Sequence, residues 1–238
     1  MRIRKHSILV IILLISSMVV SAQDNNKILN RPYADMKKFH FGFSVGVHTQ
    51  DLQFTHNGYV SEAGDTWFME IPDFSPGFCV NVLADMRLAK HFNLRFSPGM
   101  YFGNKIIKMV DTTNGGEESQ NVKTNYIVLP VDLKISAERY YNIRPYVVGG
   151  GMLTIDVSKK RSDFLMFNNT DFMLTVGFGC DIYLPYFKLT PEVKFCFGLT
   201  DILDRKRPDL KDDPDMMKYT NSLKKVTSNM FILTFYFE

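Results

Sequence analysis

Residues 39–48 read FHFGFSVGVH, and this stretch decides how the rest of the chain is interpreted. Its odd positions are large and apolar, whereas its even positions are His, Gly or Ser. A period of two is typical of a β-strand with two unlike faces. A soluble sandwich would place the bulky face inside and turn Lys, Glu and Thr toward water. The small, polar second face instead favours a cramped polar interior, with the bulky face outside.

The same alternation recurs along the chain and predicts seven further strands. The fifth strand along the chain, residues 143–156, cannot be phased, because Gly149–Gly151 leave no side chains to compare. The last carries spaced aromatic residues up to Phe237 and resembles the C-terminal signature of outer-membrane barrels, although Glu238 ends the chain. The predicted strands cover residues 39–48, 78–88, 93–102, 126–136, 143–156, 172–184, 187–199 and 230–238.

The connections between these strands alternate in length. Long polar stretches are predicted at 49–75, 104–125, 157–169 and 201–228, and tight turns at 89–92, 137–141 and 185–186. Short periplasmic turns and long extracellular loops are typical of transmembrane β-barrels. Because lipid cannot satisfy an open sheet edge, the sheet must close. We therefore predict an all-β fold, an eight-stranded antiparallel transmembrane β-barrel.

The N-terminus predicts export from the cytoplasm. Residues 1–22 combine a basic start, the apolar run ILVIILLI and small residues, which is the pattern of a secretory signal peptide cleaved after Ala22. Residues 23–38 then form a periplasmic N-terminal segment, and residues 39–238 form the barrel. The predicted location is the cell outer membrane. A net charge of +3 gives no reason to expect binding to nucleic acid.

The polar faces of the strands are predicted to fill the barrel. Eight strands enclose a space just wide enough for side chains, so a packed polar plug is expected and not a pore. Both signs of charge are present and can pair in place of water. The predicted lumen residues are His40, Asn81, Asp85, Arg87, Arg95, Asp132, Lys134, Asp181, Lys188, Glu192 and Lys194.

No catalytic, cofactor-binding or metal-binding residue is assigned from the sequence, and no cofactor is expected. Cys79, Cys180 and Cys196 match no zinc or disulfide spacing and are interpreted as small apolar residues within strands. His40 and His48 share a strand face, but they lie roughly 26 Å apart at ~3.3 Å per residue, too far to share a metal. The expectation is a protein that is not an enzyme.

Two segments resemble a known family. Residues Asn30–Tyr59, NRPYADMKKFHFGFSVGVHTQDLQFTHNGY, resemble the N-terminal part of the PorT family, and RPYVVGGG at Arg144–Gly151 resembles the wider group of outer-membrane barrels to which that family belongs. The resemblance implies an outer-membrane component needed for type IX secretion and the associated gliding machinery. Its expected partners are the lipid bilayer and other type IX components. The RPYADMKK segment, residues 31–38, is one predicted contact surface, and the long loops are the others.

Three alternatives to this function and one to this fold stay open. A surface-exposed adhesion barrel would act through its extracellular loops. A lipid-modifying enzyme would need Ser, His and an acidic or amide residue together at the rim, where His48 could supply one member. A narrow pore is the third. A soluble periplasmic calyx or sandwich would turn the apolar faces inward.

Overall fold

The computed structural model describes residues 30–59, 67–70, 75–111, 117–158, 165–205, 220 and 222–238. The signal peptide therefore lies outside the described residues. A short 3-10 helix, η1 (Ala34–Met36), precedes the strands. No helix in the described ranges has the length and apolar character of a membrane span. The strands are β1 (Phe39–His56), β2 (Trp67–Glu70), β3 (Pro76–Arg87), β4 (Phe92–Phe96), β5 (Gly99–Asp111), β6 (Glu117–Ser136), β7 (Ile143–Asp156), β8 (Thr170–Tyr183), β9 (Lys188–Gly198) and β10 (Leu223–Phe237).

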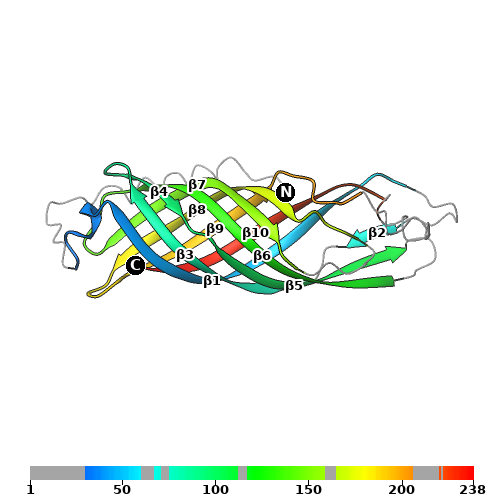
Figure 1. Ribbon diagram of the computed structural model, residues 1–238, viewed down its shortest axis with the longest axis horizontal. Helices are drawn as coiled ribbons and strands as arrows, with labels where there is room; N and C mark the ends of the chain where they lie inside the picture. The colour runs from blue at the N-terminus through cyan, green and yellow to red at the C-terminus, as the bar shows by residue number, and fades with distance from the viewer. Residues whose placement is uncertain are drawn as a thin grey trace, which may run out of the picture.

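The strands form one closed antiparallel sheet (Figure 1). Strands adjacent in the chain pair from β6 to β10, and β10 returns to β1, which also pairs with β3. The gap between β3 and β6 is filled by β4 at one end and by β5 at the other. Since β4 and β5 together occupy one position and β2 pairs only with β5, the ring has eight positions, as predicted.

The bulky face of β1 lies outside the barrel. Phe41 is 71% exposed and Phe43 is 54% exposed, whereas Ser44 and His48 are buried. Val82 on β3 pairs with Phe43 and is 64% exposed. This arrangement excludes the soluble calyx and sandwich, in which the apolar faces would be internal. The glycine-rich strand β7 is now phased as well, with Tyr146 inside.

Pro98 divides the predicted third strand into β4 and β5. Proline has no amide hydrogen, so it cannot continue the ladder to both neighbours. Its carbonyl still accepts a hydrogen bond from the Val82 amide at 2.9 Å. The amide of Ser97 bonds to the Pro130 carbonyl at 3.4 Å. The interruption therefore leaves the wall of the barrel closed.

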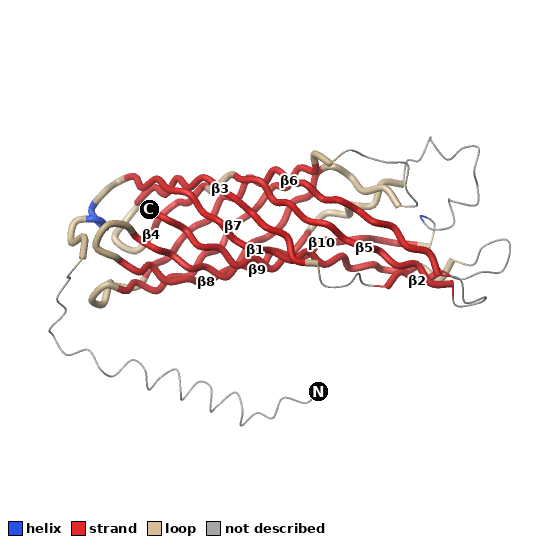
Figure 2. The backbone as a smooth tube through the Cα atoms, turned by 90° about the horizontal axis from the view of Figure 1, so that it is seen from below, coloured by secondary structure: helices blue, strands red, loops and turns tan. Residues whose placement is uncertain are grey.

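Three of the predicted long loops are wrong in extent, because strands continue into them. Within the segment predicted as loop 49–75, β1 runs on to His56 and β2 follows. Within 104–125, β5 and β6 pair from Gly99 and Val128 out to Val110 and Glu117. Within 201–228, β10 already begins at Leu223. Figure 2 shows β2 and the far part of β5 at the end opposite the C-terminus.

The sequence pattern hid these extensions because its polarity reverses there. On β1, the outward residues change from Val47, which is apolar, to Asp51 and Gln53, which are polar. The inward residues change from His48 to the buried apolar Leu52. A second apolar core fills this far part of the barrel, formed by Leu52, Met69, Ile107, Met109, Leu165, Ile202, Leu203, Leu223 and Val226.

Candidate functional site: the barrel interior and its two mouths

Arg95 on β4 is the centre of an ion-pair network inside the barrel. Its side chain is fully buried and lies 2.7 Å from the Glu192 carboxylate on β9 and 3.3 Å from that of Asp85 on β3. The guanidinium also lies over the ring of Tyr236, 4.8 Å from its centroid. Arginine suits this position because its planar charge can pair with two carboxylates and contact an aromatic face together.

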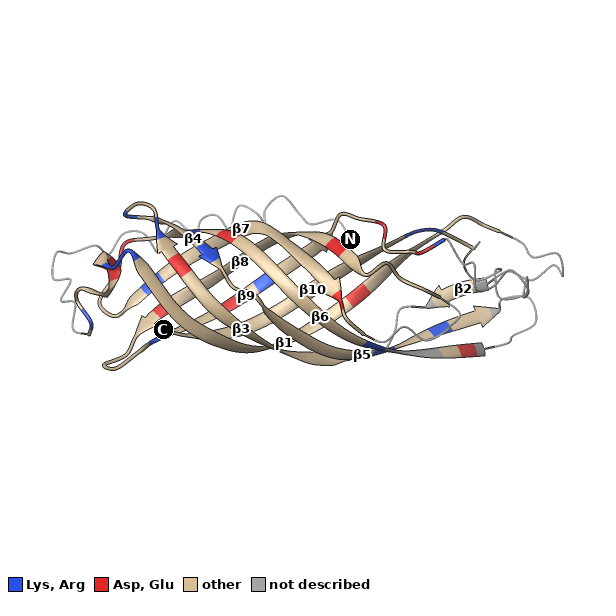
Figure 3. Cartoon of the chain, viewed as in Figure 1, with Lys and Arg blue, Asp and Glu red and all other residues tan. Residues whose placement is uncertain are grey.

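Two lysines make further pairs across the lumen. Lys134 on β6 donates to both oxygens of Asp181 on β8, at 2.8 and 2.7 Å. Lys194 on β9 lies 2.6 Å from Asp132 on β6. Charges of both signs accordingly lie on the strands toward the end that carries the C-terminus (Figure 3). Most of the predicted lumen residues are buried as expected, with His40 and Arg87 only partly buried near the rim.

Glycine makes room for one of the aromatic members of this network. Tyr146 on β7 donates a hydrogen bond to Glu192 at 2.7 Å. An ideal Cβ placed on Gly179 of the neighbouring strand would overlap the Tyr146 hydroxyl and the Pro191 carbonyl. Because Gly179 has no side chain, the tyrosine can cross the inner wall and reach its carboxylate.

The prediction of a packed polar plug is only partly right. Between the ion-pair network and the far apolar core lies a layer of apolar and aromatic side chains. Two of the three cysteines, Cys79 and Cys196, belong to it, and all three cysteines are free. The layer consists of Cys79, Tyr101, Val128, Met152, Met173, Cys196, Met230 and Ile232. The lumen is thus filled by side chains in successive layers.

A closed antiparallel barrel with an apolar exterior and a packed, largely polar interior is the architecture of an outer-membrane β-barrel. The chain matches the family model described as "Outer membrane protein beta-barrel domain" over residues 21–204, and it belongs to that family. No curated protein matches the chain.

Several solved structures are similar to the chain at low identity. OprG from Pseudomonas aeruginosa is 12% identical with a TM-score of 0.45, over 84% of this chain and 92% of that one. Neisserial surface protein A is 12% identical with a TM-score of 0.43, over 84% of this chain and 98% of that one. Ail, the attachment invasion locus protein of Yersinia pestis, is 12% identical with a TM-score of 0.34, over 85% of this chain and 99% of that one.

The polarity reversal gives the position of the bilayer along the strands. Thr49 pairs with Phe231 on β10, and Asp51 pairs with Asn229, so the outward residues of both strands turn from apolar to polar at the same level. Residues 39–49 match the ~9–11 residues that a tilted strand needs to cross a membrane. The end with the short turns faces the periplasm, and the extended strands project on the extracellular side.

The segment before β1 folds back over the periplasmic mouth, and we call residues 30–38 the periplasmic cap. The Asp35 carboxylate lies 3.5 Å from Arg139 and 3.3 Å from Arg144, and it accepts a hydrogen bond from the Tyr183 hydroxyl. Arg31 adopts a left-handed φ of 45° and donates to the Glu238 carbonyl at 3.0 Å. Asp35 therefore attaches the cap to the β6–β7 turn and to strands β7 and β8, and Arg31 attaches it to the C-terminal residue.

Neutralising Asp35 is expected to loosen the periplasmic cap. The Asp35→Asn variant loses attraction to two arginines in a partly exposed site, an effect of about 1 kcal/mol. Trypsin cleavage at Lys37 and Lys38 should then be about fivefold faster in the folded protein, since cleavage follows the open population. Limited proteolysis of the purified barrel measures this rate. The Glu138→Gln variant, which alters an exposed ion pair on a neighbouring turn, should leave it unchanged.

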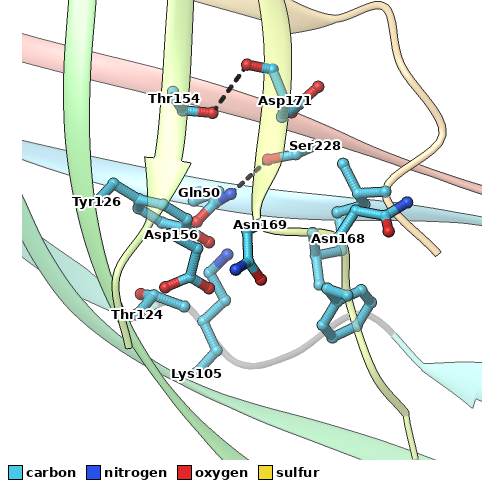
Figure 4. Close-up of a pocket in the computed structure, with 13 residues that line it drawn as sticks. Gln50, Lys105, Thr124, Tyr126, Thr154, Asp156, Asn168, Asn169, Asp171 and Ser228 are labelled. Carbon is cyan, nitrogen blue, oxygen red and sulfur yellow. Dashed lines mark hydrogen bonds between the residues drawn. The ribbon is translucent and has the colours of Figure 1, made fainter. Parts of the chain in front are cut away.

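The second mouth carries a pocket, which we call the extracellular pocket. It lies between the apolar layer and the far apolar core and encloses about 470 Å³ of empty space, part of it open to solvent. Leu52, Phe167 and Ile202 line its apolar side. Figure 4 shows the polar residues converging on it from several strands. These polar residues include Gln50, Lys105, Thr124, Asp156, Asp171 and Ser228.

The projecting part of the barrel is tied together near this mouth by two polar residues. The Nε2 atom of His56 accepts a hydrogen bond from the Met69 amide at 3.1 Å and so joins β1 to β2. Burial lowers the pKa of His56, which favours the neutral, accepting form. Asp201 accepts hydrogen bonds from the amides of Val226 and Leu203 at 3.0 and 3.2 Å. Partial burial acts to raise the pKa of the Asp201 carboxyl. The two amide hydrogen bonds and the nearby Arg205 outweigh it, so that the pKa of Asp201 is lowered.

His48 points into the barrel and not toward the lipid rim. Its ring packs on Tyr101, with 5.0 Å between ring centroids, and lies close to Gly77. His40 lies near the other end of the same strand, 3.7 Å from the Glu238 carboxylate. Within the described ranges, no group of three or more His, Cys, Asp or Glu side chains is placed to hold a metal ion.

Sequence reasoning missed the residues that matter at the two mouths. Lys105 lies in a stretch predicted as loop, so its position on an inward strand face was not apparent. Asp35 lies in a segment without periodicity, and its partners are distant in the chain: Arg139 is in the β6–β7 turn and Arg144 is at the start of β7. No alternation marks the strand around Lys105, because NKIIKMV reads polar, polar, apolar, apolar, polar, apolar, apolar.

Proposed function

We propose that this protein is an outer-membrane accessory component of type IX secretion and acts by binding, not by catalysis. The resemblance of Asn30–Tyr59 to the PorT family supports this role. The observation that supports the binding mode is the periplasmic cap, because the first part of that resembling segment, residues 30–38, is attached across the periplasmic mouth by Arg31 and Asp35. A lumen filled with ion pairs and apolar side chains also fits a binding role better than a conducting one.

The outer side of the periplasmic cap is the proposed partner surface. Arg31, Ala34 and Asp35 face the barrel, whereas Tyr33 is 73% exposed and Met36 is 69% exposed. An exposed aromatic residue and an exposed methionine are the residue types enriched at protein interfaces. The adjacent Lys37 and Lys38 add positive charge. The expected partner is therefore a periplasmic protein surface with an apolar, acidic patch.

A Tyr33→Ser/Met36→Ser variant is expected to block secretion without affecting the barrel. Neither side chain contributes to the contacts that attach the cap, so the barrel should fold normally. Folded barrels migrate differently on a gel before and after boiling, and this heat-modifiable band should remain at its normal level in the outer-membrane fraction. Cargo of the secretion system should accumulate in the periplasm. Fractionation and immunoblotting of a deletion strain complemented with each variant measure both quantities.

The matched control for this experiment is Tyr186→Ser. Tyr186 lies on the β8–β9 turn at the same end of the barrel and is 93% exposed. Its loss should leave secretion normal. Normal secretion in both the double variant and the deletion strain would refute the secretion role. Loss of the heat-modifiable band in the double variant would make the two side chains structural and refute the proposed contact surface.

A second candidate function is binding at the cell surface. It is favoured by the extension of β1, β5, β6 and β10 beyond the bilayer around their own apolar core. A rigid projection of this kind suits contact with a host or neighbouring cell. A deletion strain would then secrete normally but lose adhesion, which distinguishes this function from the first.

A further inference from the structure

Lys105 lines the extracellular pocket, and its ammonium forms no hydrogen bond or ion pair with the described residues. Lys105 is only 5% exposed, and the carboxylates of Asp156 and Asp51 attract its charge from beyond ion-pair distance. Figure 4 shows it extending into the pocket from β5 toward Asp156 and Asn169. A buried ammonium without an acceptor is energetically unfavourable. The pocket therefore offers a donor that a ligand could satisfy.

Acceptors without donors lie in the same pocket. Thr200 donates to one oxygen of the Asp171 carboxylate, but the other oxygen, Oδ2, is buried and has no partner. The Oε1 atom of Gln50 is also buried and unpaired, although its Nε2 donates to Ser228. Asp156 is engaged by the Ser158 amide at 2.8 Å. The pocket thus combines an unsatisfied cation with unsatisfied acceptors that do not pair with one another.

We propose that the extracellular pocket binds a small zwitterion, an α-amino acid with an apolar side chain. Its carboxylate accepts hydrogen bonds from Lys105, and its ammonium donates to Asp171 and Gln50. A neutral molecule would leave the buried charges uncompensated, and a simple anion would meet two carboxylates, those of Asp156 and Asp171. One ligand that carries both charges satisfies both sets of groups.

The shape of the extracellular pocket fits the remaining part of such a ligand. Leu52, Phe167 and Ile202 form an apolar wall opposite the charged groups and would take the side chain. Asn168 and Asn169 are exposed and form the rim through which a ligand would enter. Because part of the space is open to solvent, a small ligand could extend toward this rim.

The test uses the full barrel refolded in detergent micelles and isothermal titration calorimetry. L-leucine is the probe, with N-acetyl-L-leucine lacking the ammonium, L-leucinamide lacking the carboxylate, and D-glucose as a neutral polar compound. L-leucine should bind with a Kd of about 1 mM or tighter. Each blocked analogue should bind about tenfold more weakly or worse, because one buried charge then stays unpaired.

Two variants assign the charges to their residues. Lys105→Met should weaken L-leucine binding and abolish the preference for leucine over leucinamide, while Asp171→Asn should abolish the preference over N-acetyl-leucine. Methionine has similar bulk and removes an unpaired buried charge, so Lys105→Met should fold at least as stably, which thermal unfolding checks. Lys123→Met, an exposed lysine on β6 near the same end, is the matched control and should bind leucine normally.

Three outcomes would overturn the proposal: no binding of L-leucine, equal binding of D-glucose, or leucine binding that is unaffected in Lys105→Met. The proposal is independent of the role in secretion, since the binding test needs only the purified barrel. A failed secretion experiment would therefore leave it standing, and a failed titration would leave the secretion role untouched.

Discussion

Replacing Arg95 with methionine is expected to destabilise the barrel by about 3–5 kcal/mol, because the buried Asp85 carboxylate loses its cation and Glu192 keeps only Lys194, 3.3 Å away. This loss of stability should exceed the loss caused by removing any exposed charged side chain. Urea unfolding of the refolded barrel, followed by the heat-modifiable mobility shift and by tyrosine fluorescence, measures it. The variant should also show a lower temperature for the gel shift.

A second substitution tests whether charge, and not lost volume, causes this effect. Adding Glu192→Gln to the Arg95→Met variant should recover part of the stability, since a neutral amide no longer needs the missing cation. If the two losses simply add, the ion pair is not the cause and the interpretation fails. Arg205→Met is the control, because its pair with Asp201 is exposed and should be worth little.

An arginine placed on the outer face of β1 is expected to reduce the stability of the barrel strongly at one position and hardly at all at another position eight residues further along. Val45 lies near the middle of the apolar band of residues 39–49, and Val45→Arg should cost about 2–4 kcal/mol of stability in lipid. Gln53 is on the same face but beyond the polarity reversal, so Gln53→Arg should cost almost nothing. Unfolding of each variant in lipid vesicles measures the difference.

The comparison between these two variants locates the membrane boundary. Equal tolerance at both positions would mean that the exterior of β1 does not face lipid at Val45. Equal loss at both would move the boundary outward past Gln53 and assign the extracellular extension to the membrane. A large loss at Val45 alone supports the boundary inferred from the Thr49–Phe231 register.

The facing of the strands could be predicted because it depends on local periodicity. Phe41, Phe43 and Val45 alternate with Gly and Ser, and this pattern alone indicates which face accepts water, lipid or a crowded interior. The lumen positions of Arg95 and Glu192 followed from the same rule. The pairing between them did not, because they are 97 residues apart and meet only when the sheet closes.

The extent of the strands could not be predicted in the same way. Stretches such as Thr49–His56 are polar on the outside because they are surrounded by water. They therefore lack the apolar outer face of a membrane-spanning strand and resemble loops in the sequence. Nothing local in NKIIKMV indicates where the membrane ends. That boundary becomes visible only when β1 and β10 lie side by side and change polarity at the same level.

The sequence by itself determined the alternation of faces and the number of ring positions, because both depend on neighbouring residues. Only the tertiary structure decided which charges pair across the lumen, that the periplasmic cap is fixed through Asp35, and that Lys105 lies unpaired in a pocket. These features bring together residues from distant strands and turns. Closure of the barrel fixes the distances between such residues in space, and these distances cannot be derived from their separation along the sequence.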